Sequence, residues 1–217
     1  MALMRSKEVP KDAVTLDEME AADYVWNLVS EWDSPYDTWA LKYAPVILGG
    51  VNALCGVLIN RYYRNKLKLG PYGYFASVVP ITAMPAVLTT LFHRHLISTD
   101  LLLMKSQSCP ICYEVRSAVV QCSLGLAYPM VLGPAAALMF SHRYSTYRIP
   151  DLKEGPIVMF KFLRKMTRPF YGTLTFMLTG QVIASSIFTY YEMRNNLTIR
   201  KKIMAIEAKI LAEKENS

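Results

Sequence analysis

The pair Cys109 and Cys112, separated by two residues, is the one motif in this chain whose residue types could do chemistry. Two cysteines at this spacing can form a redox couple, supply half of a four-ligand zinc site or close a local disulfide. Zinc would need two further ligands, and the nearest candidates are His93 and His95. Redox catalysis by such a pair normally uses a soluble thioredoxin-like domain. We therefore favour a structural pair, disulfide-bonded if its loop faces an oxidising compartment.

The usual catalytic patterns are absent from the rest of the sequence. It contains no G-x-S-x-G, no H-E-x-x-H and no paired-carboxylate site, and Gly70-Pro71-Tyr72-Gly73 lacks the spacing and the lysine of a phosphate-binding loop. We therefore expect no enzymatic activity, no cofactor and no resident metal.

The distribution of charge indicates a membrane protein. Four stretches contain no Asp, Glu, Lys, Arg or His, and each approaches or exceeds the roughly 20 apolar residues of helix that cross a bilayer. Apolar residues fill these blocks without the polar face that a helix in water would need. We predict an all-α membrane protein built on a four-helix transmembrane bundle, with spans over residues 44–60, 72–92, 117–141 and 169–191.

Amphipathic helices are predicted on either side of this transmembrane domain, which covers residues 44–191. Residues 1–43 form an acidic segment in which Thr15 and Glu18 have the spacing of a capping box ahead of a helix. Its acidic face would be repelled by anionic lipid, so docking on a partner protein or on the chain's own spans is favoured. Residues 192–217 should continue the fourth span as a charged helix with isoleucines at helical spacing.

Small and polar residues mark the faces through which two of the spans should pack. Small residues let helices approach closely, and asparagine can hydrogen-bond across the contact. These faces are either a packing seam within the bundle, which is favoured, or a docking face for another protein. They comprise Gly49, Asn52, Gly56 and Asn60 in the first span and Gly125, Pro129 and Gly133 in the third.

Prolines inside the second and third spans predict kinks in both. Pro80 and Pro85 interrupt the second span, and Pro129 and Pro134 interrupt the third. Broken helices sometimes mark transporter sites, so a small-solute transporter remains an alternative. Against it, no predicted span holds an acid, a base or a histidine in its middle, where proton and ion pathways usually have one.

Basic residues are concentrated in two loops, which predicts the orientation of the chain. Residues 61–71 and 142–168 hold eleven Lys or Arg against two acids, whereas residues 93–116 hold three Lys or Arg. With four spans the two basic loops share one side, and the positive-inside rule places them on the cytoplasmic or matrix face, where lipid and not nucleic acid is the expected contact. The basic residues singled out are Arg61, Arg64, Lys66, Lys68, Arg143, Arg148, Lys153, Lys161, Arg164, Lys165 and Arg168.

Several strings, in order and spacing, resemble the transmembrane protein 126 family over about residues 44–190. The long acidic amino-terminal segment departs from that likeness, and between the two types of member the strings look more like the A type. The strings are Val51-Asn52-Ala53-Leu54-Cys55-Gly56-Val57 with Arg61 and Arg64, Cys109 and Cys112 with Arg116, Gly125-Leu126-Ala127-Tyr128-Pro129, then Arg143-Tyr144, Pro150, Lys153, Gly155, Lys165-Met166 and Thr179-Gly180-Gln181.

The resemblance implies a mitochondrial inner-membrane protein that assists assembly of the membrane arm of respiratory complex I. It places the basic loops in the matrix and both termini in the intermembrane space, where a disulfide between Cys109 and Cys112 would be consistent with an oxidising compartment. The expected mechanism is scaffolding: the small-residue faces of the first and third spans would pack against membrane-arm subunits, and the basic loops would recruit other assembly factors. A permanent accessory subunit of a respiratory complex is the second alternative.

Overall fold

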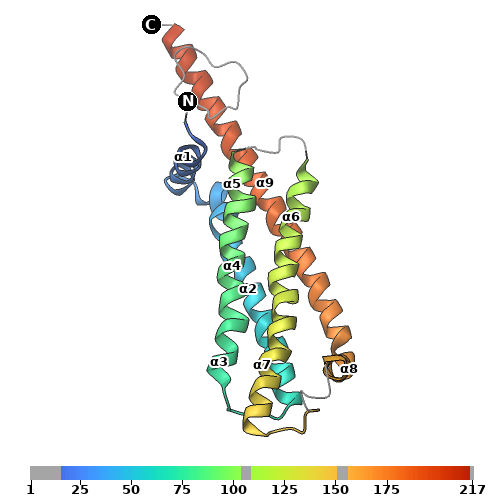
Figure 1. Cartoon of the computed structure of the whole chain (residues 1–217). Helices are drawn as coiled ribbons and strands as arrows, with labels where there is room; N and C mark the ends of the chain where they lie inside the picture. Colours follow the sequence, from blue (N-terminus) through green and yellow to red (C-terminus); the bar gives the residue numbers. More distant parts are fainter. Residues whose placement is uncertain (1–15, 104–108, 151–155, 216–217) are drawn as a thin grey trace. The chain divides into compact units, whose positions relative to one another are not determined.

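Helices are the regular elements throughout the described part of the chain, residues 16–103, 109–150 and 156–215 of a computed structural model (Figure 1). This helical content agrees with the charge-free blocks of the sequence, because a backbone in lipid must satisfy its own hydrogen bonds. The expected all-α class is therefore confirmed.

The amino-terminal helix α1 runs from Glu18 to Ser30. Its N-cap is Asp17, whose backbone N–H donates to Glu20 Oε2 at 3.2 Å. Asp17 and Glu20 thus form a capping box, whereas the predicted box of Thr15 and Glu18 includes Thr15, which lies outside the described residues. The two boxes differ by two residues because Thr and Asp are both good N-caps and each has a glutamate three residues later.

Two helices extend well beyond the predicted spans. Helix α2 runs from Pro35 to Lys66, and helix α9 runs from Tyr171 to Glu215. The boundaries predicted at 43/44 and 191/192 therefore lie inside continuous helices. They mark changes in composition along a helix and not breaks in the backbone.

The second apolar block continues as helix to Leu102, ten residues past its predicted end. It comprises α3 (Tyr74–Val78), the π-helical turn η1 (Val79–Ala83), α4 (Met84–His93), the π-helical turn η2 (Arg94–Ser98) and α5 (Thr99–Leu102). No proline or glycine follows His93 in this stretch, so nothing in the local sequence ends the helix there.

The third apolar block comprises α6 (Pro110–Cys122), the π-helical turn η3 (Ser123–Ala127) and α7 (Tyr128–Tyr144). Turns η1 and η3 lie at or beside Pro80 and Pro129, where the sequence predicted interruptions. A π turn widens the hydrogen-bond ring by one residue, which is one way a helix accommodates such a position.

The loop after α7 contains a helix that the sequence did not predict. Helix α8 runs from Pro156 to Thr167 and is followed by the 3-10 turn η5 (Arg168–Phe170), which leads into α9. The sequence predicts a basic loop over residues 142–168 because they carry charge. Charge excludes a span but does not exclude a short helix at the membrane surface.

In the described part of the chain, three helices are long and apolar enough to cross a membrane: Pro35–Lys66, Tyr74–Leu102 and Pro110–Tyr144. Three of the four predicted spans lie in these helices, except for residues 72 and 73, which precede the second helix. The fourth, residues 169–191, lies in α9, which does not reach the same apolarity because threonine, serine, glycine and glutamine interrupt its apolar residues. A fourth span in α9 stays a prediction, as do kinked spans.

The chain divides into two compact units. Unit 1 takes its described residues from Met1–Pro45, Phe92–Ser117 and Ser186–Ser217, and unit 2 comprises Val46–Leu91 and Ala118–Ser185. Unit 2 has a core of fully or nearly fully buried side chains from α2, the segment that follows it, α7, η5 and α9. Its members are Cys55, Ile59, Tyr63, Leu67, Leu69, Ala137, Phe140, Phe170 and Met177.

Unit 1 has its own core, in which α1 packs against α2, α5, α6 and α9. Its buried members are Val25, Val29, Leu41, Leu101, Leu102, Tyr113 and Ile199. Trp26 of α1 donates from Nε1 to Thr99 Oγ1 at 3.0 Å, and its ring lies 4.3 Å from the guanidinium carbon of Arg94. The sequence left two docking sites for the amino-terminal helix, a partner protein or the chain's own spans. In the structure α1 packs against other helices of the same chain.

Side chains of α9 donate hydrogen bonds to the carbonyl groups at the C-terminal end of α5 within unit 1. Asn196 Nδ2 donates to the Leu101 carbonyl at 3.0 Å, and Arg200 Nη2 donates to the Leu102 carbonyl at 2.6 Å. Burial lowers the pKa of the Arg200 guanidinium from its usual value. An arginine still keeps its proton in a protein, so Arg200 remains a cation facing the negative end of a helix dipole.

Candidate functional site

The small-residue face of α2 packs against the chain's own second apolar helix in unit 2. Gly49 and Gly56 are buried, and a Cβ atom added there would lie 2.6 Å from the Ala86 carbonyl oxygen and 2.5 Å from that of Ile81, respectively. Real Cβ atoms do not approach a backbone oxygen this closely. Glycine is therefore required at both positions for the two helices to reach this separation.

Asn52 lies between these glycines and begins a buried hydrogen-bond network. Its side chain is fully buried, and Nδ2 donates to Thr89 Oγ1 of α4 at 2.6 Å. Gln121 Nε2 of α6 lies 2.9 Å from Asn52 Oδ1 and 2.6 Å from Gln181 Oε1 of α9. Four helices thus meet through amide and hydroxyl groups, which are costly to leave unpaired in an apolar interior.

The small residues of the third block complete the same interior. A Cβ atom added at Gly125 would lie 2.5 Å from Asn52 Cγ and 2.6 Å from Gln181 Nε2. The side chains of Asn52 and Gln181 therefore occupy space that is open only because residue 125 is glycine. Pro129 and Gly133 are also buried, and a Cβ at Gly133 would lie 3.2 Å from Ile59 Cγ2.

The small-residue faces are therefore covered by the chain's own helices. Asn60, which the sequence also assigned to the small-residue face of the first span, is 2% exposed. The favoured interpretation, a packing seam within the bundle, agrees with this placement. The scaffolding mechanism that used these faces to bind other subunits does not, because no surface is left on them for a partner.

Gly125→Ala is expected to destabilise the protein by about 1–3 kcal/mol, because the added methyl group must displace Asn52 or Gln181 from the network. Thermal unfolding in detergent micelles measures the effect. Gly180→Ala is the matched control, since nothing lies within 4 Å of a Cβ there and alanine favours the helix. Equal melting temperatures for the two variants would contradict the packing described.

A second buried polar cluster lies in unit 1 and pairs a histidine with a glutamate. His93 Nε2 lies 3.1 Å from Glu192 Oε2, and the two residues are 1% and 0% exposed. Ser98 Oγ donates to the other carboxylate oxygen, Oε1, at 2.9 Å. Ser117 Oγ lies 3.4 Å from His93 Nδ1. Each ring nitrogen and each carboxylate oxygen therefore has a polar neighbour.

The sequence interpretation missed this cluster. The predicted second and fourth spans end at residues 92 and 191, so His93 and Glu192 fall one residue outside them. The continuation of helix to Leu102 instead places His93 inside a candidate span, where ionisable groups are usually functional. The available signal was the absence of any helix terminator after His93.

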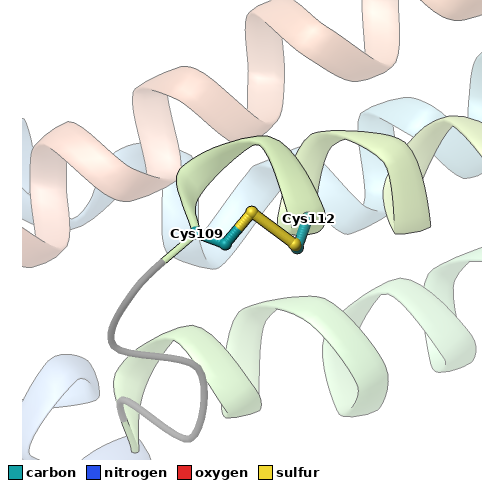
Figure 2. Close-up of a disulfide and its surroundings, with 2 residues drawn as sticks. All are labelled: Cys109 and Cys112. Atoms are coloured by element: carbon teal, nitrogen blue, oxygen red, sulfur yellow. A yellow bond between two sulfur atoms is a disulfide. The ribbon is translucent and has the colours of Figure 1, made fainter.

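Cys109 and Cys112 form a disulfide at the start of α6, with their Cα atoms 5.3 Å apart (Figure 2). Figure 2 shows the bond lying along the first turn of the helix, and Cys112 is exposed. With both sulfurs bonded to each other and His93 paired with Glu192, the zinc alternative conflicts with the structure. Among the described residues no group of three or more His, Cys, Asp or Glu gathers into a metal site.

Alkylation of the denatured protein is expected to modify two cysteines per chain without a reductant and four with one. The two modified first should be Cys55 and Cys122, which are the free thiols among the described residues. Intact-mass measurement counts the adducts. Four adducts in the absence of reductant would contradict the disulfide.

Arg64 is a structural cation and not a free charge of the first basic loop. It is 4% exposed; Nη2 donates to the carbonyls of Gly70 at 2.7 Å and Tyr72 at 2.8 Å, and Nη1 donates to Ser77 Oγ at 2.8 Å. Gly70 and Gly73 both have positive φ, so the chain turns sharply around the guanidinium. This corrects its assignment as a recruiting residue.

The remaining basic residues assigned to this side are solvent-exposed wherever the structure describes them, and Lys153 lies outside the described residues. Exposed charge is what orientation in a membrane and contact with anionic headgroups require. The exposed set is Arg61, Lys66, Lys68, Arg143, Arg148, Lys161, Arg164, Lys165 and Arg168.

Comparison with known proteins agrees with the resemblance in the sequence. A family model described as Transmembrane protein 126 matches residues 30–208. A Drosophila melanogaster protein named Transmembrane protein 126 is 39% identical over 215 residues, covering 98% of this chain and 96% of that protein. No solved structure gives a significant match. The chain is a membrane protein and belongs to the transmembrane protein 126 family.

Proposed function

We propose that this chain is a non-enzymatic assembly factor of the mitochondrial inner membrane that scaffolds the membrane arm of respiratory complex I. The observation that carries the proposal is membership of the family over residues 30–208, because the resemblance implies this role. Partners would be membrane-arm subunits, other assembly factors and membrane lipid.

The buried network changes the surface on which scaffolding would occur. The small-residue faces are buried against other helices of unit 2. A partner would therefore contact the exposed apolar side chains on the outside of this unit. On α4 and α7 these include Val87, Val131 and Met139, which are 56%, 67% and 60% exposed. Such side chains can contact lipid or an apolar subunit, so exchange between the two would allow a transient complex.

The orientation proposed for the chain follows from the exposed basic residues of α2, α7 and α8. They would face the matrix, and both termini would face the intermembrane space together with Cys109 and Cys112. That side would also expose the disulfide to an oxidising compartment. Protease digestion of mitochondria with ruptured outer membranes should then remove an epitope tag from either terminus.

Depletion of the protein followed by re-expression tests the role itself. The proposal predicts loss of assembled complex I and accumulation of membrane-arm intermediates, with complexes III and IV unchanged, and recovery with the intact chain. Gly180→Ala, which leaves the bundle packing unchanged, should restore complex I fully. Unchanged complex I in depleted cells would refute the proposal.

A small-solute transporter is the second candidate, and the buried pair of His93 and Glu192 favours it. The case against transport is the absence of ionisable groups within the predicted spans, and His93 of this pair lies within Tyr74–Leu102, a helix of spanning length. Proteoliposomes of the purified protein would then show solute or proton flux that Glu192→Gln abolishes. Tight vesicles with no flux would remove this candidate.

A further inference from the structure

A cavity of about 370 Å³ lies in unit 2 where α7 ends. Its lining residues are Ser141, His142, Ser145, Tyr147, Arg148 and Ile149. Its described lining residues supply a guanidinium, an imidazole and three hydroxyl groups, and none of these described residues is an acid. Hydrogen-bond donors together with a positive charge are the chemistry that recognises a phosphate group.

The turn that forms this cavity is held in place by its own hydrogen bonds. Ser145 has a left-handed backbone, with φ of 50°, and ends α7. The N–H groups of Ser145 and Thr146 both donate to the Ser141 carbonyl, which reduces the negative potential at the helix end. Thr146 Oγ1 donates to the Leu67 carbonyl at 3.0 Å and so ties the turn to the segment that follows α2.

Helix α8 flanks the cavity and is anchored by one face. The rings of Tyr147 and Phe162 lie 6.4 Å apart, and Tyr62 Oη donates to the Met166 carbonyl at 2.9 Å. The opposite face carries Ile157 and Phe160, which are 69% and 68% exposed. Beside them Lys161, Arg164 and Lys165 are exposed.

Exposed apolar and basic side chains on one helix face are typical of a helix lying at the lipid headgroup level. The position of the cavity supports the same level. His142 is the first ionisable residue after the charge-free stretch 117–141, and α7 belongs to a helix of spanning length. The cavity therefore opens where a membrane-spanning helix meets the aqueous phase.

We propose that the cavity at the end of α7 binds the phosphate of an anionic phospholipid, with α8 lying on the same leaflet. Arg148 and His142 would contact the phosphate, and the hydroxyls of Ser145 and Tyr147 would orient it. The basic residues of α8 would contact neighbouring anionic headgroups, and Ile157 and Phe160 would enter the acyl region.

Native mass spectrometry of the full-length protein in detergent tests this site, with phosphatidylglycerol and phosphatidylcholine of identical acyl chains as probes. The proposal predicts retention of phosphatidylglycerol in excess over phosphatidylcholine, and a loss of about tenfold in that excess for the double variant His142→Gln/Arg148→Gln. A second, independent variant, Lys161→Gln/Arg164→Gln on the exposed face of α8, should weaken retention without touching the cavity lining.

The control variant Lys201→Gln/Lys209→Gln removes two positive charges from exposed positions on α9, as many as the α8 variant removes, and should retain the lipid. Equal retention of the two lipids by the intact protein would overturn the proposal. So would an equal loss in the control variant, which would indicate general charge attraction only. Displacement of phosphatidylglycerol by millimolar inorganic phosphate would assign the cavity to a free ion instead.

Discussion

Glu192→Ala is expected to destabilise the protein by about 2–5 kcal/mol, one of the two largest effects that the structure predicts. The carboxylate is fully buried against His93 and Ser98, so its removal takes away the partner of His93 Nε2 and the shorter of the two contacts of the Ser98 hydroxyl. The lower free-energy value applies if His93 and Glu192 form a neutral hydrogen bond, and the upper value applies if they form a buried ion pair. Thermal unfolding in detergent micelles measures the loss.

Two companion variants separate this pair from a general effect of substitution. His95→Ala changes the same residue type two positions away on an exposed surface, and should shift stability by no more than about 0.5 kcal/mol. His93→Ala combined with Glu192→Ala should cost clearly less than the two single losses added together, because the pair is broken only once. Strict additivity would mean that the two side chains do not interact.

Arg64→Ala is expected to lower the free energy of unfolding by about 3 kcal/mol or more. The guanidinium holds the carbonyls of Gly70 and Tyr72 and the hydroxyl of Ser77 at the same time, and hydrogen bonds to a charged group contribute about 1.5–3 kcal/mol each. Arg64→Lys should recover little, because a single ammonium cannot match a planar group with five donors.

The matched control for Arg64 is Arg61→Ala, one helical turn away and exposed. Its cost should stay within about 0.5 kcal/mol. Limited proteolysis offers a second readout, since loss of the Arg64 contacts should open the turn at residues 67–73 to cleavage. Equal stability and equal protease resistance of the two variants would show that Arg64 is an ordinary surface charge.

The sequence predicted the helices well where charge was absent and poorly where helices continued past charge. Apart from a few residues at their starts, the stretches without acids, bases or histidine lie within α2, α9 and the two helices formed by residues 74–102 and 110–144. Their ends were misjudged at His93 and Arg116 because an ionisable residue was taken to end the buried helix. The structure instead pairs His93 within unit 1 and Arg116 with Asp100.

The candidate site could be predicted only in part, because a face of a helix does not specify what covers it. Glycine spacing along α2 identified a close contact, yet the partner could have been another subunit. The position of Gly125 against Asn52 and Gln181 shows that the partner is the same chain. The same limit applies to Arg64, whose burial depends on how the following turn folds and not on its neighbours in sequence.

Migration of this protein on native gels of mitochondrial membranes solubilised in mild detergent, mapped against complex I subunits by mass spectrometry, tests the assembly role most directly. The account predicts migration with subcomplexes that contain membrane-arm subunits and absence from the complete enzyme. Stoichiometric migration with complete complex I would contradict it in favour of a permanent accessory subunit. Migration apart from both would contradict it in favour of a transporter.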